Sequence, residues 1–266
     1  MTLSATQDRM PEVKEVLDRV GVKGIALPLR VDLGGLSQCV LWEASLFIDL
    51  DGDKKGVHMS RLTESLYEAA EQAYRSLPEF GILALRLLQR RHRYRQGRVL
   101  LRGSVLLRRS TPSTHRSSFE PYDVTCEVLL RDGKPLCSLA VKVVGSTLCP
   151  HSLESTGGMA HSQRASVYLK VTSSDALPKL EELVEIAEEA LSAPSLTLLK
   201  ASDEVQLVKR MYQRPMFVED VARECLKLAR QRGLKGRLRV IVEALESIHK
   251  HNAWAEIVRE LGDGHD

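Results

Sequence analysis

Three side chains capable of metal binding or proton transfer lie close together near the middle of this 266-residue chain: Cys149, His151 and His161. They fall in a Gly- and Ser-rich connection between two strand-like stretches, and loops held by strands commonly carry functional residues. A thiolate and an imidazole together suit zinc or ferrous iron, and a catalytic site keeps three protein ligands so that water can occupy the open position. The spacing of Cys149 and His161 is not that of a structural zinc finger, so this pair alone is a weak indication of a metal site.

The C-terminal half adds carboxylates and imidazoles in three short clusters, which are Asp203-Glu204, Glu219-Asp220 and Glu246-Ser-Ile-His249-Lys-His251. Each cluster also has a purely structural explanation. Acidic residues in the first turn of a helix interact favourably with the helix dipole, and a histidine can cap or decorate a loop. Taken one at a time, these residues are explained more simply by structure than by chemistry.

The hydrophobic pattern predicts the elements that must position these side chains. In the first half it predicts strands over residues 22–31, 38–50, 99–107, 122–130 and 136–144, with helices over 59–77 and 80–94. In the second half it predicts strands over 165–171, 238–244 and 254–258, with helices over 178–192 and 217–231. The order of strand pair, helix pair and strand pair thus occurs twice, without a residue-level repeat. This order predicts an α+β fold, with antiparallel sheets that carry helices on one face.

The overall charge argues against a nucleic-acid partner. The chain has 38 basic and 35 acidic residues, a net charge of +3, and only 5% aromatic residues. A dedicated nucleic-acid binder is more basic and interleaves aromatic side chains with its cations. The basic run at residues 90–93 is therefore interpreted as the solvated end of a helix, and any anionic partner is expected to be small.

The apolar residues and cysteines indicate a cytoplasmic protein. No apolar run approaches the ~18 residues of a membrane span, and the first twenty residues lack the apolar stretch of a signal peptide. The five cysteines are scattered and odd in number, so a disulfide framework is not expected. We therefore expect no membrane partner.

Six short segments carry a resemblance to a known family. They are Val20-Gly-Val-Lys-Gly24, Lys55-Gly-Val-His58-Met-Ser-Arg61, Leu148-Cys-Pro-His-Ser152, Ala160-His-Ser-Gln-Arg164, Arg214-Pro-Met-Phe-Val-Glu-Asp220 and Glu246-Ser-Ile-His249. In this order they resemble the signature segments of the GTP cyclohydrolase IB family, over residues 16–258. Each segment is short, but six in one order are specific.

The resemblance implies a bimodular tunnelling fold with two ββααββ modules. It places an N-terminal segment at residues 1–19, the first module at 20–147 and the second at 148–266. It also implies a homo-oligomer, a tetramer in the family, with active sites at module or subunit interfaces.

The resemblance further implies an activity and the residues that perform it. The expected reaction is metal-dependent hydrolysis of GTP to 7,8-dihydroneopterin triphosphate and formate, which begins pterin and folate synthesis. The expected metal is zinc, and iron(II) and manganese are also compatible with the ligands. The residues that match the family's positions are Cys149, His161 and Glu204 for the metal, Glu246 and His249 for proton transfer, Glu219 for the guanine edge, and His58, Arg61, Gln163 and Arg164 for the triphosphate.

One departure from the family leaves alternatives open. The family reads Cys-Pro-Cys-Ser where this chain has Cys149-Pro150-His151-Ser152, so His151 is predicted to replace the second cysteine as a general acid. Ser162 stands where the family has Asn, which leaves the adjacent His161 unchanged. Two other functions remain: an archaeal-type enzyme that forms a cyclic phosphate of dihydroneopterin, and a pterin- or purine-binding protein without turnover.

Overall fold

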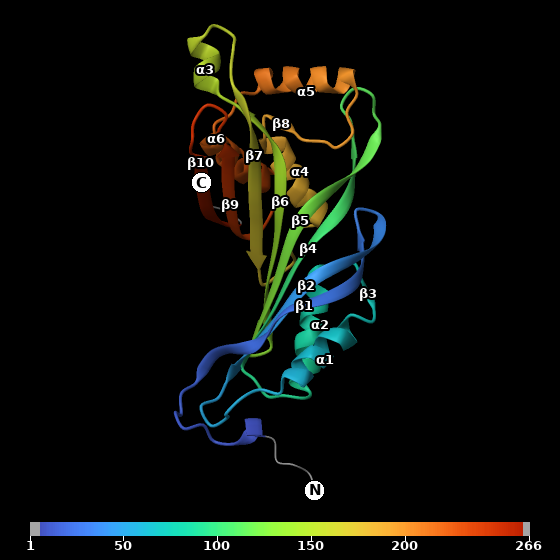
Figure 1. The fold of residues 1–266 in the computed structure, drawn as a ribbon, viewed down its shortest axis with the longest axis vertical. Coiled ribbons are helices and arrows are strands. Elements are labelled where there is room, and N and C mark those ends of the chain that lie inside the picture. The colour runs from blue at the N-terminus through green and yellow to red at the C-terminus, as the bar shows by residue number, and fades with distance from the viewer. Residues whose placement is uncertain (1–5, 263–266) are drawn as a thin grey trace. The chain divides into compact units, whose positions relative to one another are not determined.

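The computed structural model describes residues 6–262, which divide into two compact units. The first unit comprises Met1–Ser104 and Thr125–Ser138, and the second comprises Val105–Val124 and Leu139–Asp266. Strands β4 (Gln96–Ser110), β5 (Ser117–Arg131) and β6 (Lys134–Leu148) each contribute residues to both units. Figure 1 labels these strands.

The first unit is an antiparallel sheet with two helices. After the 3-10 helix η1 (Thr6–Asp8) come β1 (Leu17–Leu33), β2 (Leu36–Leu50), α1 (Met59–Ala69), β3 (Ala73–Tyr74) and α2 (Leu77–Gln89). The strand order in this unit is β3-β1-β2-β4-β5-β6. Gly34 and Gly35, with φ of 59° and 70°, form the two-residue turn between β1 and β2, because both positions of such a turn favour glycine.

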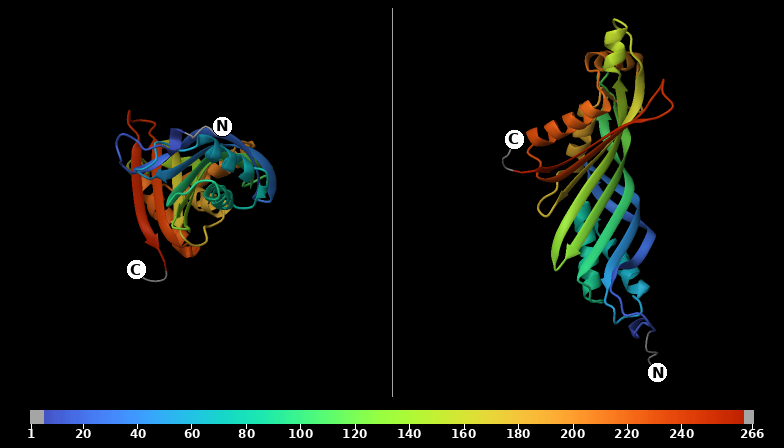
Figure 2. Two further views of the ribbon diagram at one scale, coloured as in Figure 1. Left: turned by 90° about the horizontal axis from the view of Figure 1, so that it is seen from below. Right: turned by 90° about the vertical axis from the view of Figure 1, so that its left-hand side faces the viewer.

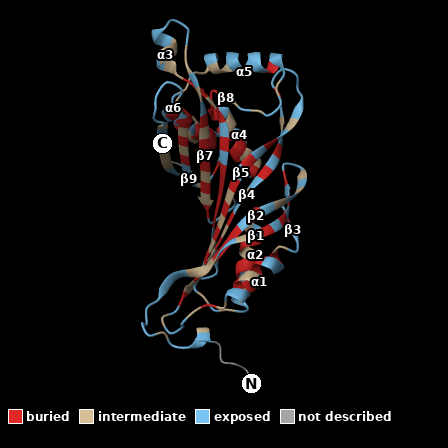
Figure 3. Cartoon of the chain, viewed as in Figure 1, coloured by how far each residue is buried: buried red, intermediate tan, exposed pale blue. Residues whose placement is uncertain are grey.

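The two helices of the first unit lie side by side and bury their apolar faces (Figures 1 and 3). Leu62 and Leu66 of α1 and Phe80 of α2 are fully buried. Gly81 permits α2 to approach the sheet closely, since a Cβ at that position would lie 2.7 Å from Cγ2 of Val128. The core of this unit therefore lies between the helices and one face of the sheet.

The second unit carries most of the residues predicted to bind metal or transfer protons. Its further elements are α3 (Pro150–Ser155), β7 (Ser162–Ser173), α4 (Leu180–Ala190), β8 (Ala193–Pro194), α5 (Ala201–Gln213), α6 (Val218–Gln231), β9 (Gly236–Leu245) and β10 (Ala253–Leu261). The strand order is β4-β5-β6-β7-β9-β10, with β8 paired to β6. Helix α6 lies along β9 and β10 and beside α4, as Figure 2 shows.

The predicted α+β class is confirmed, and single elements differ from the predictions. The helix predicted over 80–94 is α2, which ends at Gln89. The helix predicted over 59–77 ends at Ala69, and Pro78 does not break it but lies in the first turn of α2, where its missing N–H is not needed. Helix α5 was not predicted, and Leu207 is its only buried apolar side chain. The predicted module boundary at residues 147 and 148 falls at the end of β6.

Polar atoms hold helix α5 in place. The carboxylate of Asp203, which is fully buried, accepts hydrogen bonds from the N–H groups of Ser113 (2.9 Å), Thr114 (2.8 Å) and Lys200 (3.1 Å) and from the Thr114 hydroxyl (2.7 Å). Burial acts to raise the pKa of Asp203, but the hydrogen bonds outweigh it and hold the pKa below its usual range. These bonds tie the first turn of α5 to the β4–β5 loop.

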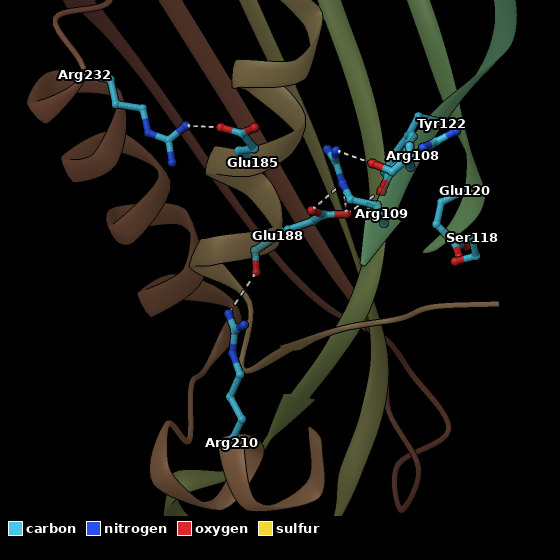
Figure 4. A network of polar contacts seen from close by, with 9 residues as sticks. All are labelled: Arg108, Arg109, Ser118, Glu120, Tyr122, Glu185, Glu188, Arg210 and Arg232. Atoms are coloured by element: carbon cyan, nitrogen blue, oxygen red, sulfur yellow. Dashed lines mark hydrogen bonds and ion pairs between the residues drawn. The ribbon is translucent and has the colours of Figure 1, made fainter. Parts of the chain in front are cut away.

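A second polar network, largely but not fully buried and shown in Figure 4, joins α4 to strands β4 and β5. Arg109 donates through Nε to Glu188 Oε2 at 3.0 Å, and Tyr122 donates its hydroxyl to the same carboxylate. Arg210 of α5 donates to the backbone carbonyl of Glu188 at 3.3 Å. Burial raises the pKa of Glu188, although the bonds from Tyr122 and Arg109 act in the opposite direction.

The Glu188 network predicts a large stability loss when one partner is removed. Glu188→Ala is expected to lower the free energy of unfolding by about 3 to 5 kcal/mol, because it leaves the Arg109 guanidinium buried without its carboxylate. Glu256→Ala is the control, since the Arg239–Glu256 pair is more exposed (49% and 30%) and should contribute less than about 1 kcal/mol. Urea unfolding at pH 7 measures both, and equal small losses would contradict the prediction.

Candidate active site

A pocket of about 240 Å³ lies in the second unit, at the ends of four segments that are distant in the sequence. These segments are the end of β6, the start of β7, the start of α6 and the loop between β9 and β10. The lining residues are Cys149, His161, Gln163, Phe217, Val218, Glu219, Glu246, His249, His251 and Ala253. The structure thus brings together six residues predicted from the sequence, namely Cys149, His161, Gln163, Glu219, Glu246 and His249.

Backbone hydrogen bonds hold these segments together. The N–H of Cys149 donates to the carbonyl of His161 at 3.1 Å, and the N–H of Met216 donates to the carbonyl of Leu148 at 3.1 Å. Strands β7 and β9 pair antiparallel, with Arg164 opposite Leu245. Main-chain contacts beside the pocket therefore join the end of β6 to the start of β7, the segment before α6 to β6, and β7 to β9.

Cys149 is the N-cap residue of helix α3, directly before Pro150, and is half-buried. Its sulfur accepts a hydrogen bond from the N–H of Ser152 at 3.4 Å, as an N-cap side chain does, and Pro150 follows at a position where a helix does not need an N–H. The thiol is thus fixed in orientation and lines the pocket.

The His161 ring is oriented by polar partners at Nδ1. The nearest is Gln163 Oε1 at 3.1 Å, followed by Ser247 Oγ at 3.3 Å and Glu246 Oε2 at 4.0 Å. Gln163 donates its Nε2 to Thr147 Oγ1 at 3.0 Å, which turns its carbonyl oxygen toward the imidazole. This arrangement suits the tautomer with the proton on Nδ1, in which the lone pair of Nε2 is available, as in histidines that ligate metals.

The donors of the pocket fit a zinc or iron(II) ion in kind but supply only part of the predicted ligand set. Cys149 and His161 offer sulfur and nitrogen, which these ions accept. Within residues 6–262, however, no three His, Cys, Asp or Glu side chains are grouped closely enough to hold a metal. Glu204, the predicted third ligand, is exposed on α5 and does not line the pocket.

Glu219 lies in the first turn of α6, where the sequence analysis favoured a stabilising interaction with the helix N-terminus. Its neighbour Asp220 makes that interaction, because Asp220 Oδ2 accepts a hydrogen bond from the N–H of Phe217 at 3.2 Å and so caps the helix. Glu219 lines the pocket instead.

The loop between β9 and β10 supplies a carboxylate and two imidazoles. Glu246, with a side chain only 10% exposed, approaches Nδ1 of His161. The rings of His249 and His251 stack with centroids 5.2 Å apart and an interplanar angle of 20°. His251 was not among the predicted site residues, although its place two positions after His249 was a signal that could have found it.

Four other predicted site residues lie outside the pocket. His151 is exposed on α3, with Nδ1 3.4 Å from Ser155 Oγ, and Arg164 is exposed on β7. His58 and Arg61 belong to the first unit, at the start of α1. There the His58 Nε2 lies 3.4 Å from Asp8 Oδ2, and Arg61 donates to the carbonyl of Arg91 at 3.0 Å.

Comparison with solved structures and known sequences places the chain in a class and then in a family. It matches the uricase of Arthrobacter globiformis with a TM-score of 0.57 and 9% identity, covering 94% of this chain and 95% of that structure. The fold is therefore the tunnelling fold. The family described as type I GTP cyclohydrolase folE2 matches residues 3–255, and the chain belongs to this family.

Individual relatives cover nearly the whole chain. The GTP cyclohydrolase MptA of Pyrococcus furiosus is 38% identical over 262 residues, which cover 95% of this chain and 98% of the relative. The GTP cyclohydrolase FolE2 of Nitratidesulfovibrio vulgaris (Miyazaki F) is 35% identical over 260 residues, covering 97% and 98%. The family expected from the six segments is confirmed.

Within residues 6–262, no helix is both long enough and apolar enough to cross a membrane.

Proposed function

We propose that this protein is a metal-dependent GTP cyclohydrolase that converts GTP to 7,8-dihydroneopterin triphosphate and formate. The observation that supports it is the pocket of the second unit, where a thiol, three imidazoles and two carboxylates from four segments meet. Family membership along the chain supports the same reaction.

The proposed roles follow from the chemistry of each side chain. The Glu219 carboxylate offers two acceptor oxygens for the N1 and N2 donors of guanine, a pattern that adenine lacks. Cys149 and His161 would hold the metal, with Glu204 as the proposed third ligand. When bound, zinc or iron(II) supplies a Lewis acid that makes water nucleophilic near neutral pH.

Proton transfer is assigned to Glu246 and His249. Ring opening and loss of formate require a proton donor at the purine nitrogens, and an imidazole exchanges protons readily near neutral pH. Both residues line the pocket. Gln163 is proposed to hold the His161 ring as well as to contact substrate.

The remaining assignments concern the triphosphate and the assembly. His58, Arg61 and Arg164 are cationic or can become so, and they stay the proposed phosphate ligands. We also expect a homo-oligomer, specifically a tetramer, and a cytoplasmic location. Sedimentation velocity tests the oligomeric state.

The test of the function is product identification. Protein reconstituted separately with zinc, iron(II) and manganese is incubated with GTP, and the products are separated and identified by mass. Formate and dihydroneopterin triphosphate are expected. The relatives named MptA fit a second candidate, in which the product is a cyclic phosphate of dihydroneopterin. Absence of formate with every metal would reject both.

The guanine assignment predicts a loss of affinity in Glu219→Gln. The new amide presents a donor where guanine also presents one, which should weaken GTP binding by about 5- to 150-fold, or roughly 1 to 3 kcal/mol. Asp220→Asn is the matched control, because the adjacent carboxylate caps the helix and should affect stability more than affinity. Calorimetric titration measures both, and equal GTP affinity in wild type and Glu219→Gln would assign Glu219 to the helix terminus.

A further inference from the structure

We propose that His251 is a positioning residue for His249: its imidazole stacks on the His249 ring and holds that ring in the pocket. The inference rests on the proposed function, in which His249 transfers protons, and adds the residue that supports it. His251 acts through His249 and transfers no proton to the substrate itself.

The loop that carries both histidines is held at its two ends. Asn252 donates through Nδ2 to Glu243 Oε1 of β9 at 2.8 Å, and Ser247 Oγ lies 3.3 Å from Nδ1 of His161. Within the described part of the chain, residues 247–251 make no main-chain hydrogen bond. The backbone of the loop therefore does not by itself fix a side chain that must act on a substrate.

The ring of His249 depends on His251 for its orientation. Both rings line the pocket, and they stack with centroids 5.2 Å apart and an interplanar angle of 20°. Within residues 6–262, the His249 side chain has no hydrogen bond or ion pair, whereas the His161 ring has polar partners at Nδ1. The stack is therefore the contact that sets how His249 faces the pocket.

The place of His251 in the loop suits it to this role. It directly precedes Asn252, whose bond to Glu243 ties this end of the loop to β9. Strand β10 then begins at the next residue. A ring on this anchored side can restrict the ring of His249, which lies two positions further into the loop.

A stack also leaves both nitrogens of His249 accessible. Nearly parallel rings meet through their faces, so the N–H groups and lone pairs, which lie in the ring planes, point past the partner ring. A hydrogen bond would orient an imidazole by occupying one of its nitrogens. The stack orients His249 without occupying an atom that must exchange protons, and such preorganisation lowers the entropic cost of reaching the reactive geometry.

The experiment compares three variants of the full chain. His251→Ala removes the ring, and His251→Phe keeps a ring that can stack but cannot carry a proton. Lys250→Ala is the matched control, because Lys250 lies between the two histidines, is exposed and does not line the pocket.

Two kinds of measurement are made on each variant. Metal-reconstituted protein gives kcat and KM for GTP. Metal-free protein labelled with isotopic histidine gives the midpoint of thermal unfolding and the nuclear magnetic resonance signals of the carbon-bound protons of the His249 ring, which are identified by their absence in His249→Ala.

In His251→Ala, kcat should fall by about 3- to 10-fold, as expected for the loss of one aromatic pair, while KM stays within about twofold. The His249 signals should lose the ring-current shift that the neighbouring ring causes. His251→Phe should restore both that shift and kcat, the latter to within about twofold of wild type. Lys250→Ala should match wild type, and all thermal midpoints should agree.

Three results would overturn the proposal. Unchanged kcat or unchanged His249 signals in His251→Ala would show that the stack does not position the ring. A loss of rate that His251→Phe does not restore would show that the His251 imidazole itself transfers protons or binds a ligand. A rise in KM at constant kcat would place His251 in substrate binding. Failure of the wild type to turn over GTP would reject the proposed reaction, whereas the His249 signals test the stack separately.

Discussion

Replacement of Cys149 by alanine is expected to lower turnover of GTP by about 10³-fold or more and to reduce the bound metal, while the protein stays folded. The thiol is the only sulfur ligand proposed, and its fixed position at the start of α3 cannot be supplied by a neighbouring side chain. The fold should survive, because a chain of this length buries a large core without a metal and Cys149 is only half-buried. Metal analysis, steady-state rates and circular dichroism give the three quantities.

Two companion variants sharpen this experiment. Cys39→Ala removes an exposed cysteine of the first unit and should leave metal content and rate unchanged. Glu204→Ala tests the third proposed ligand, which lies outside the pocket. Wild-type metal content and activity in Cys149→Ala would contradict the metal assignment. Loss of metal and activity in Cys149→Ala, but not in Glu204→Ala, would remove only Glu204 from the proposed ligands.

His249→Ala is expected to lower kcat by about 10²- to 10⁴-fold without loss of metal, the usual range for a general acid or base. His249 lines the pocket, whereas His151, which the sequence analysis also predicted to be a general acid, is exposed on α3 outside it. We therefore expect a larger loss from His249→Ala than from His151→Ala. Measurement of rate and metal content on both variants decides between them.

His151 retains a clear test of its own. If it replaces the family's second cysteine as an acid, His151→Ala should slow turnover with metal unchanged, and His151→Cys should restore part of the rate. If it is a metal ligand, alanine should lower metal occupancy as well. Full activity in His151→Ala would make the imidazole incidental and leave proton transfer to Glu246 and His249.

The strands and hairpins could be predicted because their signals are local. Alternation of apolar residues marks β1, β2, β7 and β9, and the Asp132-Gly133 turn has the positive φ angles, 48° and 78°, that its residue types indicate. Helix α5 was missed although Val205, Val208 and Tyr212 recur at helical spacing. Its attachment depends on contacts between Asp203 and residues about ninety positions away. Such pairings are invisible in a single sequence.

The site was predictable to a similar extent. Short segments identified Cys149, His161 and Glu219, because unusual residue types occur there in a recognisable order. They did not indicate that Glu204 would lie outside the pocket, since distance across loops is a property of the fold.

The polar attachment of α5 has a thermal consequence. Because Leu207 is its only buried apolar residue, and Val205, Val208 and Tyr212 are already exposed, local opening of this helix would hydrate little additional apolar surface. The heat capacity change of unfolding arises mainly from apolar hydration. The enthalpy of opening α5 would therefore be nearly independent of temperature, and the free energy of opening would vary almost linearly with temperature. The free energy of unfolding of the second unit's core, by contrast, is a curved function of temperature with a maximum.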